Sequence, residues 1–393
     1  NQIYADEEIY TLLFNKLGIS YERILKENNK ADKRLEKWYK DMFFLGKSSE
    51  DVEHLKRISA TSTPSIYLKF QIMYIRYLLL NLKIELAEEK ISLIKNAINN
   101  KEKTSKRNYF LFINMRVSLL FLRKRYEDAV NISLEASNQE SFLSGGYDYE
   151  IGAFYYNLGL NYRHLYNYEQ SKYFTTKALK IFNNNYYLKQ AIDCLILLGI
   201  SYNNLGMSDN SLQKYNKAIN LLKYLPTDYH KEYLGRINHN IGFSFQKHGN
   251  YTKAVDYYLK SLPFRIADNK LLTLINLAFC YYSLENTDKA RKLLAEVEKY
   301  DRTSIEKTFK VKIEILNILL SNKSLTSKNI NHLEGAFKYF VENNQWNNVA
   351  FYGELIAYLL EREHHYKKAN KIYKTLFLFN KNNLYNNKGG NIQ

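Results

Sequence analysis

YYNLGLNY, at residues 155–162, indicates a repeat protein, because three similar segments follow it along the chain. They are LILLGISY at residues 195–202, NHNIGFSF at 238–245 and LINLAFCY at 274–281. Each segment carries a small residue at its fifth position and an aromatic residue at its last position. Sequence repeats of about 40 residues indicate a solenoid, in which each unit buries its apolar face against the next unit.

The repeated segments resemble tetratricopeptide repeats, in which each unit is a hairpin of two helices. The small residues Gly159, Gly199, Gly242 and Ala278 would let the paired helices approach closely. Fainter copies begin near residues 68, 110 and 350, and an apolar helical stretch near 311 fits a degenerate unit. The sequence therefore predicts an all-α protein, a right-handed superhelix of about seven or eight hairpins over residues 66–377.

The composition agrees with a helical protein and excludes several other classes. The 393 residues include only 3 prolines and 15 glycines, the residues that most disfavour helices. Two cysteines cannot form a disulfide framework or a four-cysteine zinc site. No apolar run approaches the ~20 residues that span a bilayer, and no signal peptide opens the chain. We therefore expect a cytoplasmic protein without a membrane partner.

The formal charge of +17 has two interpretations. A basic protein can bind nucleic acid or another anionic partner. The 36 tyrosines and the many lysines and asparagines also fit the codon usage of an AT-rich genome. We assign most of the charge to this second cause.

The N-terminal segment predicts a short helix from Asp6, a stop at Gly18 and a second helix start before Leu25. Its acidic start, apolar helix and Leu17-Gly-Ile19 ending resemble the end of a helix-turn-helix DNA-binding domain of the phage-repressor type. A plain capping helix is the alternative. The chain does not begin with Met, so we expect the recognition helix to lie upstream.

These features predict four parts of the chain. Residues 1–25 are the C-terminal remnant of a helix-turn-helix domain, and residues 26–65 are a linker helix and hinge. Residues 66–377 form the solenoid, which serves peptide binding and dimerisation, and residues 378–393 form a flexible tail.

A helix-turn-helix remnant before a basic tetratricopeptide array resembles the PlcR and NprR group, the peptide-sensing regulators of Gram-positive bacteria. The resemblance implies a cytoplasmic quorum-sensing transcriptional regulator. Its groove would bind a short signalling peptide and control the binding of a homodimer to double-stranded DNA. Two alternatives remain: a phosphatase like the related Rap proteins, which dock a response regulator, and a scaffold that does not switch.

Asparagines at one repeat position are the main candidates for a peptide site. Asn157, Asn240 and Asn276 each lie two residues before the small residue, on the helix that lines the inner surface. Their amides can pair with the backbone of an extended ligand, and repeated asparagines hold the pheromone in the PlcR-like family. Leu197 departs from the pattern. The further candidates are Asn161, Asn203, Asn204 and Tyr281, with Arg76, Lys69, Arg236 and Lys247 for a carboxylate.

No catalytic signature appears in the sequence. The Gly46-Lys-Ser48 segment lacks the earlier glycine of a phosphate-binding loop, where Asp41 stands instead. The eight histidines show no spacing typical of metal ligands. We therefore expect no enzymatic activity, no metal and no cofactor.

Overall fold

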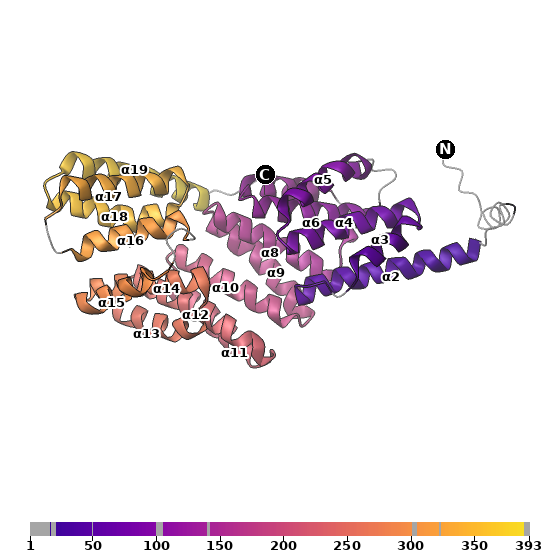
Figure 1. Cartoon of the computed structure of the whole chain (residues 1–393), viewed down its shortest axis with the longest axis horizontal. Coiled ribbons are helices and arrows are strands. Elements are labelled where there is room, and N and C mark those ends of the chain that lie inside the picture. The colour runs from indigo at the N-terminus through magenta and orange to yellow at the C-terminus, as the bar shows by residue number, and fades with distance from the viewer. Residues whose placement is uncertain are drawn as a thin grey trace. The chain divides into compact units, whose positions relative to one another are not determined.

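A computed structural model describes residues 16, 21–48, 50–99, 105–139, 142–300, 305–321 and 324–388. Throughout these ranges the regular structure is helical, with no strand (Figure 1). The predicted all-α fold is therefore confirmed. No helix within these ranges is both long enough and apolar enough to cross a membrane.

Two helices precede the repeats. Helix α2 (Tyr21–Leu45) is followed by α3 (Val52–Ala60), whose first turn is capped by the Asp51 carboxylate accepting from the backbone N–H of Glu53 at 3.0 Å. A short turn at residues 61–63 lies within the region predicted to be a linker helix and hinge, and Pro64 then opens the first repeat, a position that tolerates proline.

Eight helical hairpins follow within the described residues, in agreement with the predicted seven or eight. Successive hairpins begin 39–42 residues apart, and the predicted degenerate unit near residue 311 is the seventh of them. The pairs are α4 (Pro64–Leu80) with α5 (Ile84–Asn99), α6 (Lys106–Leu122) with α7 (Tyr126–Ser137), α8 (Asp148–His164) with α9 (Tyr168–Asn184), α10 (Leu188–Asn204) with α11 (Ser208–Leu222), α12 (Thr227–Lys247) with α13 (Tyr251–Ser261), α14 (Ala267–Ser283) with α15 (Thr287–Val297), α16 (Lys307–Leu320) with α17 (Ser327–Glu342), and α18 (Trp346–Arg362) with α19 (Tyr366–Lys388).

Two of the small residues of the repeats, Gly199 and Gly242, act as predicted. A Cβ atom added at Gly242 would lie 2.9 Å from Cδ1 of Tyr258, and one added at Gly199 would clash with the ring of Tyr215. Both tyrosines are buried on the second helix of the same hairpin. Glycine is thus needed at these two positions because an aromatic ring packs directly on the backbone of the first helix.

Most hairpin turns use the left-handed backbone conformation without glycine. The second turn residue has a positive φ at Leu82 (54°), Lys124 (58°) and Glu285 (60°), whereas Gly206 and Gly249 take the same place in two other hairpins. A left-handed residue commonly ends a helix, and glycine adopts that conformation most easily. The small number of glycines in the sequence therefore does not mean few left-handed turns, because other residues adopt the same conformation.

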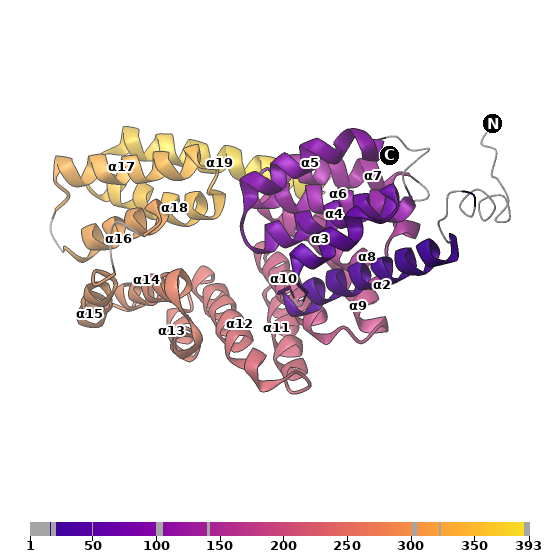
Figure 2. The same ribbon diagram turned by 45° about the vertical axis from the view of Figure 1, so that its right-hand side comes forward.

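The chain divides into two compact units, residues 1–161 and 162–393, and the boundary falls within α8. In unit 1, α2 packs against α3 and α4, with Trp38 stacked on Phe70 at 6.2 Å between ring centroids. In unit 2, one hydrophobic core contains residues from all the helices α14 through α19. Both views show α17, α18 and α19 side by side (Figures 1 and 2).

Two of the predicted boundaries differ from the helices observed. The boundary after residue 25 falls inside α2, a single helix that begins at Tyr21. The predicted tail from residue 378 begins inside α19, which continues to Lys388 because no proline interrupts it. Residues 1–15 and 17–20, which hold most of the proposed helix-turn-helix remnant, lie outside the described residues.

Candidate functional site

Residues of unit 1 on the first helices of three successive hairpins line a pocket of ≈180 Å³. Helix α4 contributes Arg76 and two leucines, α6 contributes Ser118 and its apolar neighbours, and α8 contributes Asn157 and Asn161. The pocket therefore combines three residues predicted from the sequence. The complete lining is Arg76, Leu79, Leu80, Val117, Ser118, Phe121, Leu122, Asn157, Leu160 and Asn161.

Arg76 has no acidic partner in the part of the chain that the structure describes. Its side chain is half-buried, and its guanidinium carbon lies 5.9 Å from the ring centroid of Phe43. The Nε atom is buried and has no hydrogen-bond acceptor. A buried donor without an acceptor destabilises the protein by about 1–3 kcal/mol, so an acceptor supplied by a ligand would be favourable here.

Asn161 offers an unpartnered acceptor at the same pocket. Its side chain is 1% exposed, and its Nδ2 atom donates to the backbone oxygen of Asn157 at 2.8 Å. The Oδ1 atom is buried without a donor. Asn157 itself is half-buried, and its side chain also lines the pocket.

The chemistry of this pocket fits a peptide. A free N–H donor on Arg76 and a free carbonyl on Asn161 match the acceptor and donor that every peptide unit carries. The guanidinium can also bind a carboxylate through two parallel hydrogen bonds. The pocket is smaller than the ~300–1,000 Å³ of sites that enclose a whole small molecule. It therefore fits one residue or one end of a longer ligand.

The spacing of the repeats identifies one pocket residue, Ser118, that the asparagine pattern does not predict. Helices α4, α6 and α8 begin at residues 64, 106 and 148, so each position recurs 42 residues later. Arg76, Ser118 and Leu160 are therefore equivalent positions, and all three line the pocket. Ser118 is not part of the asparagine pattern because its side chain has no amide.

The arginine predicted in unit 2 already has a partner. Nη1 of Arg236 lies 3.0 Å from Oδ1 of Asp193, and the hydroxyl of Tyr233 donates to Oδ2 of the same carboxylate at 3.1 Å. Burial raises the pKa of Asp193, and the charge of Arg236 opposes that rise only in part. Arg236 is therefore already paired with a carboxylate of the protein itself.

Two of the predicted asparagines in unit 2 are used for packing. Oδ1 of Asn203 accepts from the Ser244 hydroxyl at 2.7 Å, and Nδ2 of Asn276 donates to the Tyr258 hydroxyl at 3.3 Å. Both asparagines are buried. Asn240 is half-buried, and its side chain has no hydrogen-bond partner among the described residues.

The remaining predicted residues are spread over both units. Tyr281 is half-buried, with the ammonium of Lys289 5.2 Å from its ring centroid. Lys247 reaches the Oδ1 atom of Asn204 at 3.4 Å. The fourth cation proposed for a carboxylate, Lys69, is buried in the ion-pair network described next.

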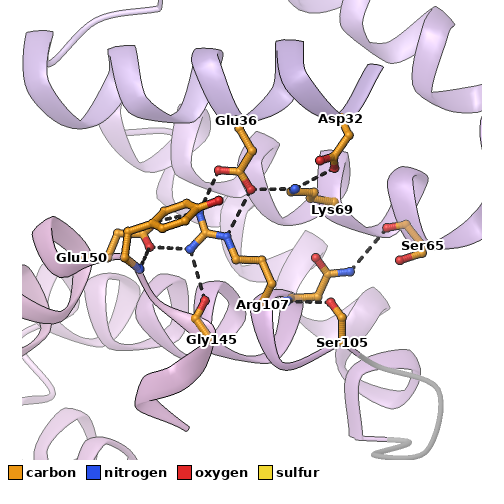
Figure 3. A network of polar contacts seen from close by, with 10 residues as sticks. Asp32, Glu36, Ser65, Lys69, Ser105, Arg107, Gly145 and Glu150 are labelled. Carbon is orange, nitrogen blue, oxygen red and sulfur yellow. Dashed lines mark hydrogen bonds and ion pairs between the residues drawn. The ribbon is translucent and has the colours of Figure 1, made fainter. Parts of the chain in front are cut away.

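A second arginine of unit 1 lies in a closed ion-pair network (Figure 3). Arg107 donates to Glu36 through Nε at 3.1 Å and Nη2 at 2.8 Å, and it also pairs with Glu150. Lys69 joins the same network, 2.6 Å from Glu36 and 2.7 Å from Asp32. Burial raises the pKa of Glu36, but the ion pairs with Arg107 and Lys69 outweigh this effect and leave the pKa below its ordinary value.

Comparison with known proteins agrees with this fold. The family model for the tetratricopeptide repeat matches residues 233–302. The transcriptional activator NprA of Geobacillus stearothermophilus is 27% identical over 404 aligned residues, which cover 97% of this chain and 95% of the relative. The resemblance to NprR-type regulators that the sequence predicts is thus confirmed over nearly the whole chain.

Solved structures show the same architecture. The apo form of the quorum sensor NprR from B. thuringiensis has a TM-score of 0.70 at 22% identity, covering 89% of this chain and 98% of that chain. NprR in complex with its cognate peptide NprX has a TM-score of 0.64 at 22% identity, covering 89% and 99%. Aspartyl phosphate phosphatase F from Bacillus subtilis has a TM-score of 0.61 at 16% identity, covering 92% and 94%.

Proposed function

We propose that this chain is a transcriptional regulator whose solenoid binds a short signalling peptide. The observation that carries the proposal is the end-to-end similarity to NprA, a transcriptional activator. The shared fold with NprR, a quorum sensor that has been solved with its cognate peptide, supports the peptide as the signal. The regulator would act in the cytoplasm, on double-stranded DNA and as a homodimer.

The pocket of unit 1 is the proposed contact for one residue of the peptide. Arg76 would bind a carboxylate or a backbone carbonyl, and Asn161 would accept from a backbone N–H. Asn157, which is half-buried, would add an amide contact in the same pocket, and Asn240 of unit 2 stays a separate prediction. Asn203, Asn276 and Arg236 are excluded from the proposed contacts because neighbouring residues already bind them.

Peptide binding must be linked to DNA binding for the protein to act as a switch. A ligand shifts an equilibrium only by its difference in affinity for the two states. We therefore propose that residues 1–25 belong to the DNA-binding part, that residues 26–65 connect it to the solenoid, and that residues 66–377 bind the peptide and form the dimer.

The alternative is a phosphatase that acts on a response regulator. The fold shared with aspartyl phosphate phosphatase F favours this second function. It predicts that the purified chain shortens the phosphate lifetime of a phosphorylated response regulator. An unchanged lifetime would exclude the phosphatase and leave the proposed regulator in place.

A library capture experiment tests peptide binding even though the sequence of the peptide is unknown. The immobilised chain is incubated with a random heptapeptide library, and the retained peptides are sequenced by mass spectrometry. We expect the wild type to enrich a defined set of peptides and Arg76→Met to lose that set. Arg236→Met is the matched control, since its arginine already pairs with Asp193. Absence of any enrichment by the wild type would contradict the proposal.

A further inference from the structure

Helix α2 carries a row of five exposed lysines: Lys26, Lys30, Lys33, Lys37 and Lys40. The spacing of four, three, four and three residues keeps them on one side of the helix, within an arc of about 80°. With a rise of 1.5 Å per residue, this lysine row is about 21 Å long. None of the five forms an ion pair with another described residue.

Three acids of the same helix are paired with other cations. Asp32 and Glu36 lie on the side of α2 that faces the repeats, where they bind Lys69 and Arg107 (Figure 3). Glu27 pairs with Arg23, one turn earlier, at 3.1 Å. Asp32 and Glu36 thus face inward, whereas the five lysines and the acids Glu22 and Glu27 near the start of the helix are exposed. Like charges three and four residues apart destabilise a helix, so the lysine row opposes the stability of α2.

We propose that the lysine row binds the phosphate backbone of double-stranded DNA. A duplex carries one negative charge per ~1.7 Å of its axis, so it can offer phosphates along the whole ~21 Å row. Lysine ammonium groups contact phosphates without reading the bases, so the row would add affinity and position the protein rather than select a sequence. The biological setting of this contact rests on the proposed function, but the contact itself is separate from the peptide pocket.

Other anionic partners fit this surface less well. A single-stranded nucleic acid needs exposed aromatic rings for stacking, and the aromatic residues between Lys26 and Lys40, Trp38 and Tyr39, are both buried. A membrane surface needs an apolar face beside the lysines, and Leu35 is also buried. An acidic protein surface is the remaining alternative, which the experiment below separates from DNA.

The test compares two quintuple variants of the full chain. The row variant carries Lys26→Gln, Lys30→Gln, Lys33→Gln, Lys37→Gln and Lys40→Gln. The control variant carries the same substitution at five exposed lysines of unit 2, namely Lys180, Lys217, Lys292, Lys328 and Lys371. Both variants lose the same net charge, so a difference between them reports position and not charge alone. The measurement is the anisotropy of a labelled duplex of arbitrary sequence over a range of salt concentrations.

We expect the row variant to bind at least about tenfold more weakly than the wild type at low salt. Its slope of log affinity against log salt should become shallower by up to about 4.5, at ~0.9 per lost phosphate contact. The control variant should shift the slope by less than about 1. Duplex should also protect the row from acetylation in the wild type, which mass spectrometry detects without any substitution.

Three results would overturn the proposal. They are an undetectable affinity of the wild type for duplex at low salt, equal losses in the two variants, and competition by poly-glutamate as strong as that by DNA at the same charge concentration. Equally strong competition by poly-glutamate would indicate that the lysine row binds an acidic protein surface. Peptide capture by the row variant should stay at the wild-type level, so failure of this proposal is distinguishable from failure of the proposed function.

Discussion

Arg76 and Arg107 lie on the first helices of neighbouring hairpins in unit 1, yet their surroundings are opposite. Arg107 is held by two carboxylates, a backbone oxygen and the ring of Tyr147, 4.3 Å from its guanidinium carbon. Arg76 has no carboxylate among the described residues, and its Nε atom has no acceptor. Arg107, whose donors are satisfied inside the protein, therefore stabilises the fold. Arg76, which is left unsatisfied beside a pocket, is available to a ligand.

In unit 2, Arg236 is a second example of an arginine whose donors are satisfied inside the protein. Arg236 is as good a candidate as Arg76 from the sequence, but Asp193, 43 residues earlier, supplies its carboxylate. Asp193 lies in the preceding repeat, on α10. The partner of an arginine in a solenoid therefore depends on the neighbouring repeat, which no single repeat reveals.

The largest expected effect is the loss of stability on removing Arg107. Arg107→Met leaves Glu150 buried without its cation and removes one of two cations from Glu36, which should lower the free energy of unfolding by about 3–5 kcal/mol. Arg76→Met should leave it unchanged or raise it by up to about 3 kcal/mol, because no ion pair is lost and a buried donor without an acceptor is removed. Urea unfolding followed by circular dichroism measures both. Equal losses in the two variants would break the comparison.

The next effect concerns two asparagines. Asn161→Leu removes the unpartnered carbonyl of the pocket and should weaken binding of a captured peptide about tenfold or more, which is ~1.4 kcal/mol or more. Asn276→Leu should lower stability, because it removes a buried hydrogen bond to Tyr258, and should leave affinity within about threefold. Calorimetric titration and thermal unfolding separate the two effects. An affinity loss in Asn276→Leu alone would reverse the assignment.

Lys312 in unit 2 is a buried cation that forms no ion pair with another described residue, although the charge of Glu306 opposes its pKa shift in part. It is 8% exposed, and burial lowers its pKa from 10.5 to about 8. Between pH 8 and 10.5 the unfolded chain therefore binds more protons than the folded chain, so this lysine makes stability rise with pH. Lys312→Met should stabilise the protein at pH 7 by roughly 1–3 kcal/mol.

The gain from Lys312→Met should shrink as pH rises from 8 to 10.5. Urea unfolding of wild type and variant at pH 7 and at about pH 10 measures the difference. A gain that is the same at both values would show that Lys312 has an ordinary pKa in the folded protein.

The smallest expected effect lies in the hairpin turns. Glu285 is exposed and has a φ of 60°, the conformation that Gly206 takes in another hairpin. Glu285→Gly should raise the free energy of unfolding by up to about 1 kcal/mol, because glycine relieves the left-handed strain but adds entropy to the unfolded chain. Glu314→Gly, at an exposed position inside α16, should instead destabilise the protein by about 1 kcal/mol. Thermal unfolding of both variants checks the opposite signs.

The sequence predicted the repeats well because they depend on local rules. Small residues at one register and apolar residues around them specify paired helices, and Gly199 and Gly242 pack as expected. The candidate site was predicted only in part. Asn157, Asn161 and Arg76 line one pocket, whereas Asn203, Asn276 and Arg236 are bound by residues of neighbouring repeats. Such pairings join residues about 20 to 40 positions apart, so periodicity within one repeat does not reveal them.

Arg76, the unsatisfied arginine of unit 1, is the proposed contact for the peptide. The most direct test is a calorimetric titration of one captured peptide into the wild type, Arg76→Met and Arg236→Met, with circular dichroism to establish that each variant is folded. We expect an affinity loss of at least about tenfold for Arg76→Met and less than about threefold for Arg236→Met. Wild-type affinity in Arg76→Met, or the larger loss in Arg236→Met, would contradict it.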